Sequence, residues 1–587
     1  MADARVLLMG LDGADWRVLS PLIDAGDMPV LQGIVEGGSS GRLLAAEPIG
    51  SAAAWATLLT GRGAHVHGVL SDVVPAHDGR ILRPVEARDR AAPTMWEIAA
   101  AEGMPWVAIG WGEPFGAGLP GLAAEGVPAP LAAVVSSAPP EDADLAALIE
   151  EGLRAGASTV DTAVDAMRSG AWRIAAVRFP AFGALVANFI RFVPPCEPGV
   201  LAARAARYAG VVREVCRAHD SWLGELVAAA GPGTSVFVVS ERGIELSVWR
   251  HPPGSSRAAS TGGAAPGIVA MRGPGFGSDA IVFGTRSTDV AAMVLGTLGI
   301  RMPEAPVAAA FPDGRVPEGA SDAVASVAAM RQSAFAAAAA ACGDRSLAVE
   351  ARTRIHAARP EEVANTAVLA GLLVERGDAA GALAAIEACR AAVLALGGGA
   401  SGDARVIPWQ LALAEARVLV ALDRCEDAAA SIDRAASAAA PQLDVLLARA
   451  SLAESEERYA DSERHARAAI DAGPSSREAR MALARALFSQ GCFAGAVDAA
   501  REALGMAWAD PVAHLLLGTA LAASGRAREA IAALEDCLRV HPEFPPALRR
   551  LAAVHMNQLG DVEAARRLMA RAVVAGRSGP SPRRPLP

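Results

Sequence analysis

The chain has 587 residues, of which 54 are basic and 64 acidic, so its formal net charge is -10. Every basic residue is arginine. Because lysine is absent, the sequence excludes a P-loop lysine on a nucleotide phosphate and a lysine that forms a Schiff base. Acidic residues outnumber basic ones, and no cluster of basic residues stands out that could neutralise the phosphates of a nucleic acid. We therefore expect that nucleic acid is not a partner.

Three features of the sequence indicate the cellular compartment of the protein. The first ten residues run directly into an apolar segment, with neither a basic leader nor a cleavage site. No uninterrupted apolar run reaches about 18 residues, the length needed to cross a bilayer. The seven cysteines contain no C-x-x-C motif and suit buried reduced thiols. We therefore expect a soluble, cytoplasmic protein without a membrane partner.

Up to about residue 315, short apolar runs bounded by Gly, Pro or Asp alternate with helical stretches. The expected strands are 5–9, 106–109, 174–177, 235–239 and 267–271. The expected helices are 19–23, 53–59, 95–101, 201–230 and 288–298. This alternation predicts an α/β domain in which a mostly parallel sheet lies between helices.

From residue 360 onward the pattern is helical, and an internal repeat is visible. Tight-turn positions recur every 34 residues, with a last step of 35, at Asp423, Glu457, Gly491, Gly525 and Gly560. Five residues after each turn stands a small residue: Ala428, Ser462, Ala496, Ala530 and Ala565. Gly377 with Ala382 marks an earlier copy, separated by a Gly-rich insertion at 397–402.

This register resembles the tetratricopeptide repeat family. The copy from Asp510 shows the resemblance best, with Leu517, Gly518, Gly525, Ala530 and Pro542. The resemblance implies an all-α solenoid over 361–575, in about six copies, that binds a protein or peptide. Residues 313–360 are expected to be a linker with an Ala-rich helix at 322–341. Residues 576–587, rich in Pro, Ser and Arg, are expected to be disordered.

Candidate chemistry lies in the first half of the chain. Asp12 and Glu241 each follow an expected strand, and the carboxyl ends of strands are where open α/β sheets place ligands. Ser51 precedes an expected helix, where the amide groups of the first turn favour an anion such as phosphate. A helix N-cap is the alternative for Ser51.

The order of these residues resembles the alkaline phosphatase superfamily, nearest to type I phosphodiesterases and nucleotide pyrophosphatases. The matching motifs are Gly10-Leu11-Asp12-Gly13, Met28-Pro29-Val30-Leu31, Ser51 with Thr60-Gly61, His67-Gly68 and Met95-Trp96-Glu97. We expect this domain to cover residues 1–312. The resemblance implies Ser51 as nucleophile and two metal ions held by Asp and His residues. It places Asp12, Ser51 and Glu241 at one of the two metals.

Several metal ligands that the resemblance implies are replaced. Where the family has Ser-Asp-His-Gly, this sequence has Ser240-Glu241-Arg242-Gly243, and an arginine cannot coordinate a metal. At the second metal, Gly183 and Ala187 stand at the Asp and His positions. The family's last His falls among residues 259–263, which contain none. We expect His219 and Asp220, late in a helix, to lie on the surface.

Two hypotheses follow for function. In the first, the domain keeps the phosphodiesterase fold but is a non-catalytic or ligand-binding module without a cofactor, tethered to protein-binding repeats. In the second, it is a phosphohydrolase of altered mechanism, in which Ser51 acts with one divalent metal such as zinc, held by Asp12 and Glu241. In a variant of that mechanism, Arg242 contacts the phosphate of the ligand.

Overall fold

The computed structural model describes 4–45, 50–76, 80–112, 115, 129–194, 196, 199–244, 265–304, 309, 312, 322–341, 344–396, 408–506, 510–540 and 544–577. It divides into two compact units, Met1–Asp344 and Arg345–Pro587. The insertion at 397–402, the stretch 259–263 and residues 578–587 of the expected tail lie outside the described residues.

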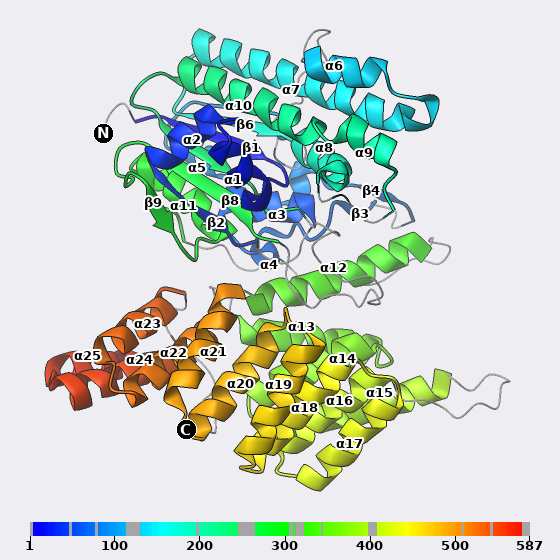
Figure 1. Ribbon diagram of the computed structural model, residues 1–587, viewed down its shortest axis with the longest axis vertical. Coiled ribbons are helices and arrows are strands. Elements are labelled where there is room, and N and C mark those ends of the chain that lie inside the picture. Colours follow the sequence, from blue (N-terminus) through cyan, green and yellow to red (C-terminus); the bar gives the residue numbers. More distant parts are fainter. Residues whose placement is uncertain are drawn as a thin grey trace. The chain divides into compact units, whose positions relative to one another are not determined.

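A seven-stranded sheet forms the centre of the first unit, in the order β5-β6-β1-β7-β8-β2-β9 (Figure 1). Its strands are β1 (Val6–Leu11), β2 (Ser39–Leu43), β5 (Trp106–Ile109), β6 (Ile174–Phe179), β7 (Ser235–Val239), β8 (Gly267–Arg272) and β9 (Ala280–Val282). All strand pairs are parallel except those that β8 makes with β7 and β2. The prediction of a mostly parallel sheet is confirmed. A separate hairpin joins β3 (Val73–Pro75) and β4 (Leu82–Pro84).

Helices cover both faces of this sheet. They are α1 (Trp16–Asp24), α2 (Pro29–Glu36), α3 (Ser51–Thr60), α4 (Ala64–His67), α5 (Met95–Ala101), α6 (Ala129–Ser136), α7 (Ala143–Ser169), α8 (Ala181–Phe189), α9 (Ala202–Tyr208), α10 (Val211–Ala230) and α11 (Ser287–Thr297). Short 3-10 turns are η1 (Ala87–Asp89), η2 (Pro140–Asp142) and η3 (Ile190–Phe192). The single helix expected at 201–230 is two helices, because the chain turns at Ala209 and Gly210.

Side-chain alternation along the strands explains the two layers of helices. In β1, Leu7 and Met9 enter a core shared with α1, α2, α7, α8 and α10. Val6 and Leu8, on the opposite face, enter a core shared with α3, α5 and α11. Because successive strand residues point to opposite faces, an apolar strand such as β1 needs a helical layer on each side.

The boundary between the units falls inside the expected linker. The Ala-rich helix α12 (Asp322–Ala341) belongs to the first unit, where it contacts α4 and β3. The next helix, α13 (Arg345–Ala358), belongs to the second unit and packs on α14. The segment 313–360 therefore contributes one helix to each unit.

The second unit consists of paired helices, and each pair is one copy of the predicted repeat (Figure 1). The first helices of the pairs, here called A helices, are α14 (Val363–Glu375), α16 (Trp409–Ala421), α18 (Gln442–Ser455), α20 (Arg477–Ser489), α22 (Pro511–Ala523) and α24 (Pro545–Val554). The second, the B helices, are α15 (Ala379–Leu396), α17 (Cys425–Ser437), α19 (Tyr459–Ala472), α21 (Phe493–Met506), α23 (Ala527–Val540) and α25 (Val562–Arg577).

The backbone explains the repeated turn residues. All six predicted turn positions have a left-handed φ, between 60° and 84°, at Gly377, Asp423, Glu457, Gly491, Gly525 and Gly560. Glycine adopts this conformation without steric cost, which is why it recurs there. The six small residues that follow the turns are 0% or 1% exposed, as close helix packing requires: Ala382, Ala428, Ser462, Ala496, Ala530 and Ala565.

The last repeat step is 35 residues because α24 continues into a π-helical turn, η5 (His555–Leu559). Ala552 stands 34 residues after Gly518, whereas Gly560 stands 35 residues after Gly525. The extra residue therefore lies between Ala552 and Gly560, where the wider π turn accommodates it. The register of helix packing before and after this turn is kept.

One described helix, α15, is long and apolar enough to cross a membrane by length and composition alone. It occupies the B position of the first repeat, where Ile386 and Cys389 pack against α14 and α16. Only 17% of this helix is buried, so the packing accounts for part of its apolar composition. The absence of a membrane partner stays a prediction.

Candidate functional site

The candidate residues gather at the carboxyl ends of neighbouring strands. Asp12 is the first residue after β1, and Glu241 stands two residues after the end of β7. Arg178, near the end of β6, is paired across the ladder with Gly10 of β1. Ser51 is the first residue of α3. Asp12 and Ser51 both contact Arg178, a residue that sequence reasoning missed.

An ion pair with two hydrogen bonds joins Asp12 to Arg178. The guanidinium Nε donates to Oδ1 at 2.8 Å and Nη2 donates to Oδ2 at 2.6 Å. The two side chains are only 14% and 12% exposed. Burial raises the pKa of Asp12, and the hydrogen bonds and charge of Arg178 lower it. Arg178 therefore occupies both oxygens of the carboxylate that the resemblance assigns to a metal.

Ser51 lies beside the same guanidinium, with its Oγ 3.4 Å from Nη2 of Arg178. Gly50, rather than Ser51, is the N-cap of α3, so the N-cap alternative for Ser51 is wrong. The amide of Ala52 donates to Oδ1 of Asp72 at 2.7 Å. A carboxylate of the chain itself therefore binds at the helix N-terminus, where the sequence predicted an exogenous anion.

Glu241 is buried, with 1% exposure, and lies next to Ser240 and Arg242. Its Oε1 is 3.5 Å from Nε of Arg242, and its Oε2 is 3.3 Å from Oγ of Ser240. Burial and the neighbouring charge of Asp12 raise the pKa of Glu241 to about 8, although Arg178 and Arg242 oppose the shift. Burial raises the pKa of both carboxyl groups, and at neutral pH Glu241 is largely protonated.

Two indole rings form the apolar wall of the site. The guanidinium of Arg178 lies 5.0 Å from the ring centroid of Trp55 and 6.0 Å from that of Trp111. Both rings are buried, and their centroids are 5.1 Å apart. A buried guanidinium is weakly hydrated and stacks well on aromatic rings, so this wall stabilises Arg178 in its position.

Of the two positions at which the resemblance implies ligands for the second metal, Gly183 is crowded by the backbone. Gly183, in α8, packs so closely against the loop after β1 that a Cβ there would lie 2.7 Å from the carbonyl oxygen of Asp12. The aspartate that the resemblance implies at this position therefore cannot be accommodated without a backbone shift. Ala187, at the implied His position, is exposed.

Residues 6–250 match the family model of type I phosphodiesterase / nucleotide pyrophosphatase. The first unit is a phosphodiesterase-like domain. Residues 447–511 and 515–580 match a tetratricopeptide repeat model, so the predicted repeats are confirmed. A comparison with curated proteins found no match.

Three solved structures represent those to which parts of this chain are similar. A MamA structure from Desulfovibrio magneticus RS-1 has 16% identity and a TM-score of 0.26, covering 30% of this chain and 97% of that one. YrrB, described as a TPR protein with an unusual peptide-binding site, has 18% identity, a TM-score of 0.24, and coverages of 28% and 84%. The APC/C hetero-tetramer Cut9-Hcn1 has 14% identity, a TM-score of 0.29 and coverages of 42% for both.

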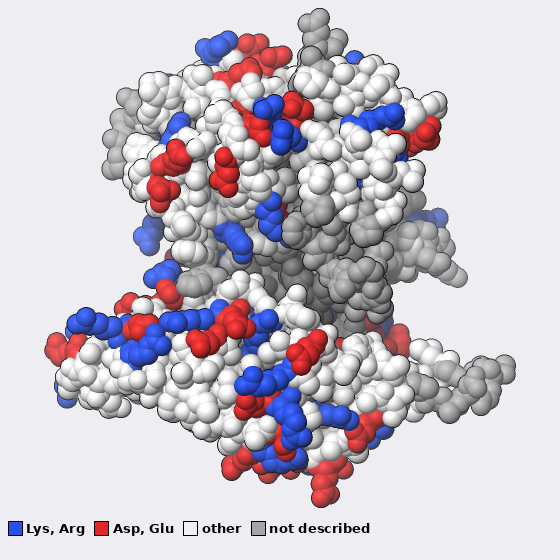
Figure 2. All heavy atoms as spheres, viewed as in Figure 1, with Lys and Arg blue, Asp and Glu red and all other residues white. Residues whose placement is uncertain are grey.

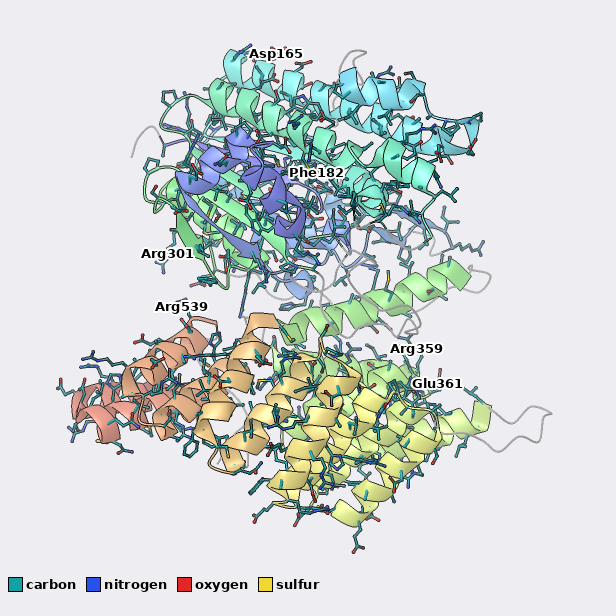
Figure 3. The ribbon with its side chains drawn as sticks, viewed as in Figure 1. Asp165, Phe182, Arg301, Arg359, Glu361 and Arg539 are labelled. Atoms are coloured by element: carbon teal, nitrogen blue, oxygen red, sulfur yellow. The ribbon has the colours of Figure 1, made fainter. Side chains whose placement is uncertain are left out.

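Two histidines of the phosphodiesterase-like domain have structural roles. His67 accepts a hydrogen bond from the Val69 amide at Nδ1, and its Nε2 donates to Thr57. His219 is buried rather than on the surface, so that expectation is wrong. It donates from Nδ1 to Val215 and packs on Phe182, which is labelled in Figure 3. Burial lowers the pKa of His67 to about 3 and that of His219 to about 4.

Asp220, also expected on the surface, is buried as well. Its two carboxylate oxygens accept the amides of Val30 and Leu31 at 2.9 and 2.8 Å, which satisfies the first turn of α2. The expectation failed because a helix-capping contact across 189 residues leaves no local sequence signal.

The described residues of the phosphodiesterase-like domain do not fit a metal ion. Within the described part of the chain, no group of three or more His, Cys, Asp or Glu side chains converges. Asp12 is bound through both oxygens by Arg178, Glu241 lies beside Arg242, and Asp72 accepts the amide of Ala52. A hydrated cation would also meet the fixed charges of Arg178 and Arg242.

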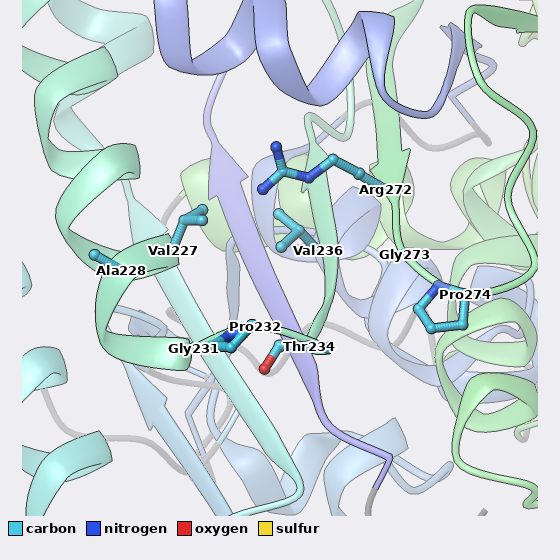
Figure 4. A pocket seen from close by; sticks show the side chains of 10 residues that line it. Val227, Ala228, Gly231, Pro232, Thr234, Val236, Arg272, Gly273 and Pro274 are labelled. Atoms are coloured by element: carbon cyan, nitrogen blue, oxygen red, sulfur yellow. The ribbon is translucent and has the colours of Figure 1, made fainter.

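A separate cleft of about 330 Å³ lies where β7 begins and β8 ends, at the ends of the strands opposite to those that carry Asp12 and Glu241 (Figure 4). Val227, Pro232 and Val236 supply apolar lining, and Arg272 is the charged residue of the lining. Nη1 of Arg272 lies 3.4 Å from the carbonyl of Gly33, in the last turn of α2. A cation near a helix C-terminus is a common structural role, so this cleft is not part of the candidate site.

Proposed function

We propose that the phosphodiesterase-like domain does not hydrolyse phosphoesters and serves as a non-catalytic module tethered to repeats that bind a protein or peptide. The observation that carries this proposal is the two-point ion pair between Arg178 and Asp12. The guanidinium holds both oxygens of the carboxylate on which a metal of this family would depend.

The charge of Arg178 and its burial oppose the binding of a metal ion at Asp12. Arginine cannot lose its proton at any pH that a folded protein tolerates, so Arg178 stays positive. A metal ion at Asp12 would have to displace Arg178, which would leave the buried guanidinium without its counter-charge. The proposal therefore includes no cofactor.

The state of Ser51 supports the same conclusion. A serine hydroxyl is a weak nucleophile unless a base or a metal removes its proton. Among the described residues, the side chain of Ser51 contacts Arg178, a donor that cannot accept a proton. The pKa of Glu241 is raised to about 8, so this carboxyl is mostly protonated at neutral pH, and its side chain contacts Ser240 and Arg242 rather than Ser51.

A second candidate is a phosphohydrolase of altered mechanism. The observation that favours it is the approach of Arg178 to Ser51, with Arg242 near the same carboxylates. Two guanidinium groups could bind a phosphate and stabilise charge that develops in its transfer. The same geometry suits a phosphate-containing ligand that is bound without being hydrolysed.

Metal content and hydrolysis of the full chain test these candidates together. We expect less than stoichiometric zinc by mass spectrometry, and no hydrolysis of bis(p-nitrophenyl) phosphate or p-nitrophenyl phosphate above the Ser51→Ala background. Ser71→Ala, at a serine whose hydroxyl donates to Val73, is the control for an unrelated hydroxyl deletion. Hydrolysis that disappears in Ser51→Ala but persists in Ser71→Ala would establish the altered enzyme. We also propose a cytoplasmic location, on sequence grounds, which fractionation of cells can check.

A further inference from the structure

One position of the B helices packs on the A helix of the next repeat. It recurs at Ile386, Ile432, Ala466, Ala500 and Leu534, which are all 0% or 1% exposed. Ile432 shares a core with Val445 and Leu452 of α18. Leu534 shares a core with Ala547 and Leu551 of α24. Five successive B helices are thus covered at this position by the helix that follows them.

The sixth B helix, α25, has Met569 at the equivalent position, 35 residues after Leu534. Met569 is 44% exposed. Val562 and Val573, seven residues before it and four after it, are 42% and 51% exposed and fall on the same side of an α-helix. We call Val562, Arg566, Met569 and Val573 the terminal face. Figure 1 shows α25 at the end of the helix array.

We propose that the terminal face binds an amphipathic helix of a partner protein, one with a small, apolar stripe and acidic flanking residues. The shape of the site follows from the stack itself, because the same interface is repeated five times along the chain. A docked helix would take the place of a seventh A helix and continue this packing.

The charge of the terminal face indicates which kind of partner helix it binds. Arg566, on the edge of the apolar stripe, is exposed and makes no ion pair with a described residue. Many other arginines of the repeats are paired with acidic side chains, such as Arg458 with Asp461 and Arg477 with Asp510, and Figure 2 shows the two charges mixed. An acidic residue of the partner helix would supply the missing counter-charge for Arg566.

The same charge disfavours two other occupants. A second copy would bring a second Arg566 toward the first, and like charges oppose association. Residues 578–587 include four prolines and two arginines, so they offer neither the composition of an A helix nor an acidic flank. The inference extends the proposed partner-binding role of the repeats and does not depend on whether the phosphodiesterase-like domain is catalytic.

Binding of a helical peptide to the full chain tests the inference. The probe is a fluorescein-labelled, hydrocarbon-stapled peptide of residues 442–455, the A helix that covers Ile432, with Arg449→Glu to make it acidic. Its basic counterpart carries Asp444→Arg and Glu454→Arg instead, and circular dichroism verifies that both are helical. We expect saturable fluorescence anisotropy with the acidic peptide, about tenfold tighter than with the basic one.

Matched variants locate the site. Met569→Glu, which places a charge in the apolar stripe, should weaken binding by about tenfold or more. Ala532→Glu, at an exposed position of α23, adds the same charge away from the terminal face and should leave affinity within about twofold. Circular dichroism of each variant confirms that the chain is folded.

Three results would overturn the inference. The first is no saturable binding of the acidic peptide, or equal loss in Met569→Glu and Ala532→Glu. The second is a dimer by sedimentation velocity that Met569→Glu dissociates, which would make a second copy the occupant. The third is peptide binding that appears only after removal of residues 578–587. None of these results bears on hydrolysis by the first unit, which the metal and phosphoester assays measure.

Discussion

Arg178 donates two hydrogen bonds to Asp12 from its Nε and Nη2 atoms, and so joins the end of β6 to the loop after β1. The two residues lie 166 positions apart in the chain. This contact puts a permanent organic cation where the family resemblance implies a divalent metal. The following predictions test its consequences and those of the repeat geometry.

Removing the guanidinium should destabilise the phosphodiesterase-like domain. Arg178→Met leaves the buried Asp12 without its counter-charge, and we expect the free energy of unfolding to fall by about 3 kcal/mol. Urea denaturation followed by tryptophan fluorescence measures the change, since Trp55 and Trp111 flank the pair. The double variant with Asp12→Asn should regain most of the loss. If single and double variants were equally destabilised, the ion pair would not be the cause.

Restoring the family aspartate in α8 should fail. Gly183→Asp places a Cβ 2.7 Å from the carbonyl oxygen of Asp12, so the loop after β1 must move. We expect a lower melting temperature and no gain of bound zinc. Ala187→Asp, one helical turn later at an exposed position, should melt close to the wild type. Thermal melts and zinc measurements on both variants test this prediction. A Gly183→Asp protein that binds zinc and melts like the wild type would contradict it.

Alkaline pH should weaken the fold through Glu241. Its pKa is raised on folding to about 8, so the folded state holds a proton that the unfolded state releases near its ordinary pKa of about 4.3. The resulting stability is fully present below the unfolded pKa and is lost as pH rises through the folded pKa. Glu241→Gln keeps the shape without this titration. The difference in free energy of unfolding between variant and wild type, measured from pH 5 to 9, should therefore grow as pH rises.

At two turns of the repeats, replacing the present residue by glycine should increase the stability of the fold. Glu457 has a φ of 60°, where a side chain is strained, and Glu457→Gly should raise the free energy of unfolding by about 0.5–1 kcal/mol. Asp423, with a φ of 61°, should gain less, because aspartate tolerates this conformation better. The reverse change Gly491→Glu should destabilise. Equilibrium denaturation of the three variants measures their free energies of unfolding. A Glu457→Gly protein less stable than the wild type would contradict the prediction.

The repeats could be predicted closely because their signals are local. A left-handed turn selects glycine, and five residues later the close approach of two helices selects a small side chain, so both constraints recur with the repeat. The structure placed all six predicted turns in the left-handed region and all six small residues in the core. The main strands were predictable for a similar reason, because a strand buried on both faces is apolar along its whole length.

Other elements lacked such a signal. β2 reads Ser-Ser-Gly-Arg-Leu and has little apolar character, yet it pairs with both β8 and β9. Its place in the sheet comes from backbone hydrogen bonds to those strands rather than from its side chains. The burial of His219 likewise depends on Phe182 and Trp222, which surround its ring in the fold.

The amino-acid sequence by itself determined the two-part organisation and the repeat register, and it places Arg242, Gly183 and Ala187 where the family resemblance implies metal ligands. Only the tertiary structure decided which group binds Asp12. Arg178 appears in the sequence as a lone charge within a buried strand, and its partner Asp12 follows a different strand. Buried charge must be compensated, but the compensating group is chosen by which strands lie side by side, a relationship that no local pattern encodes.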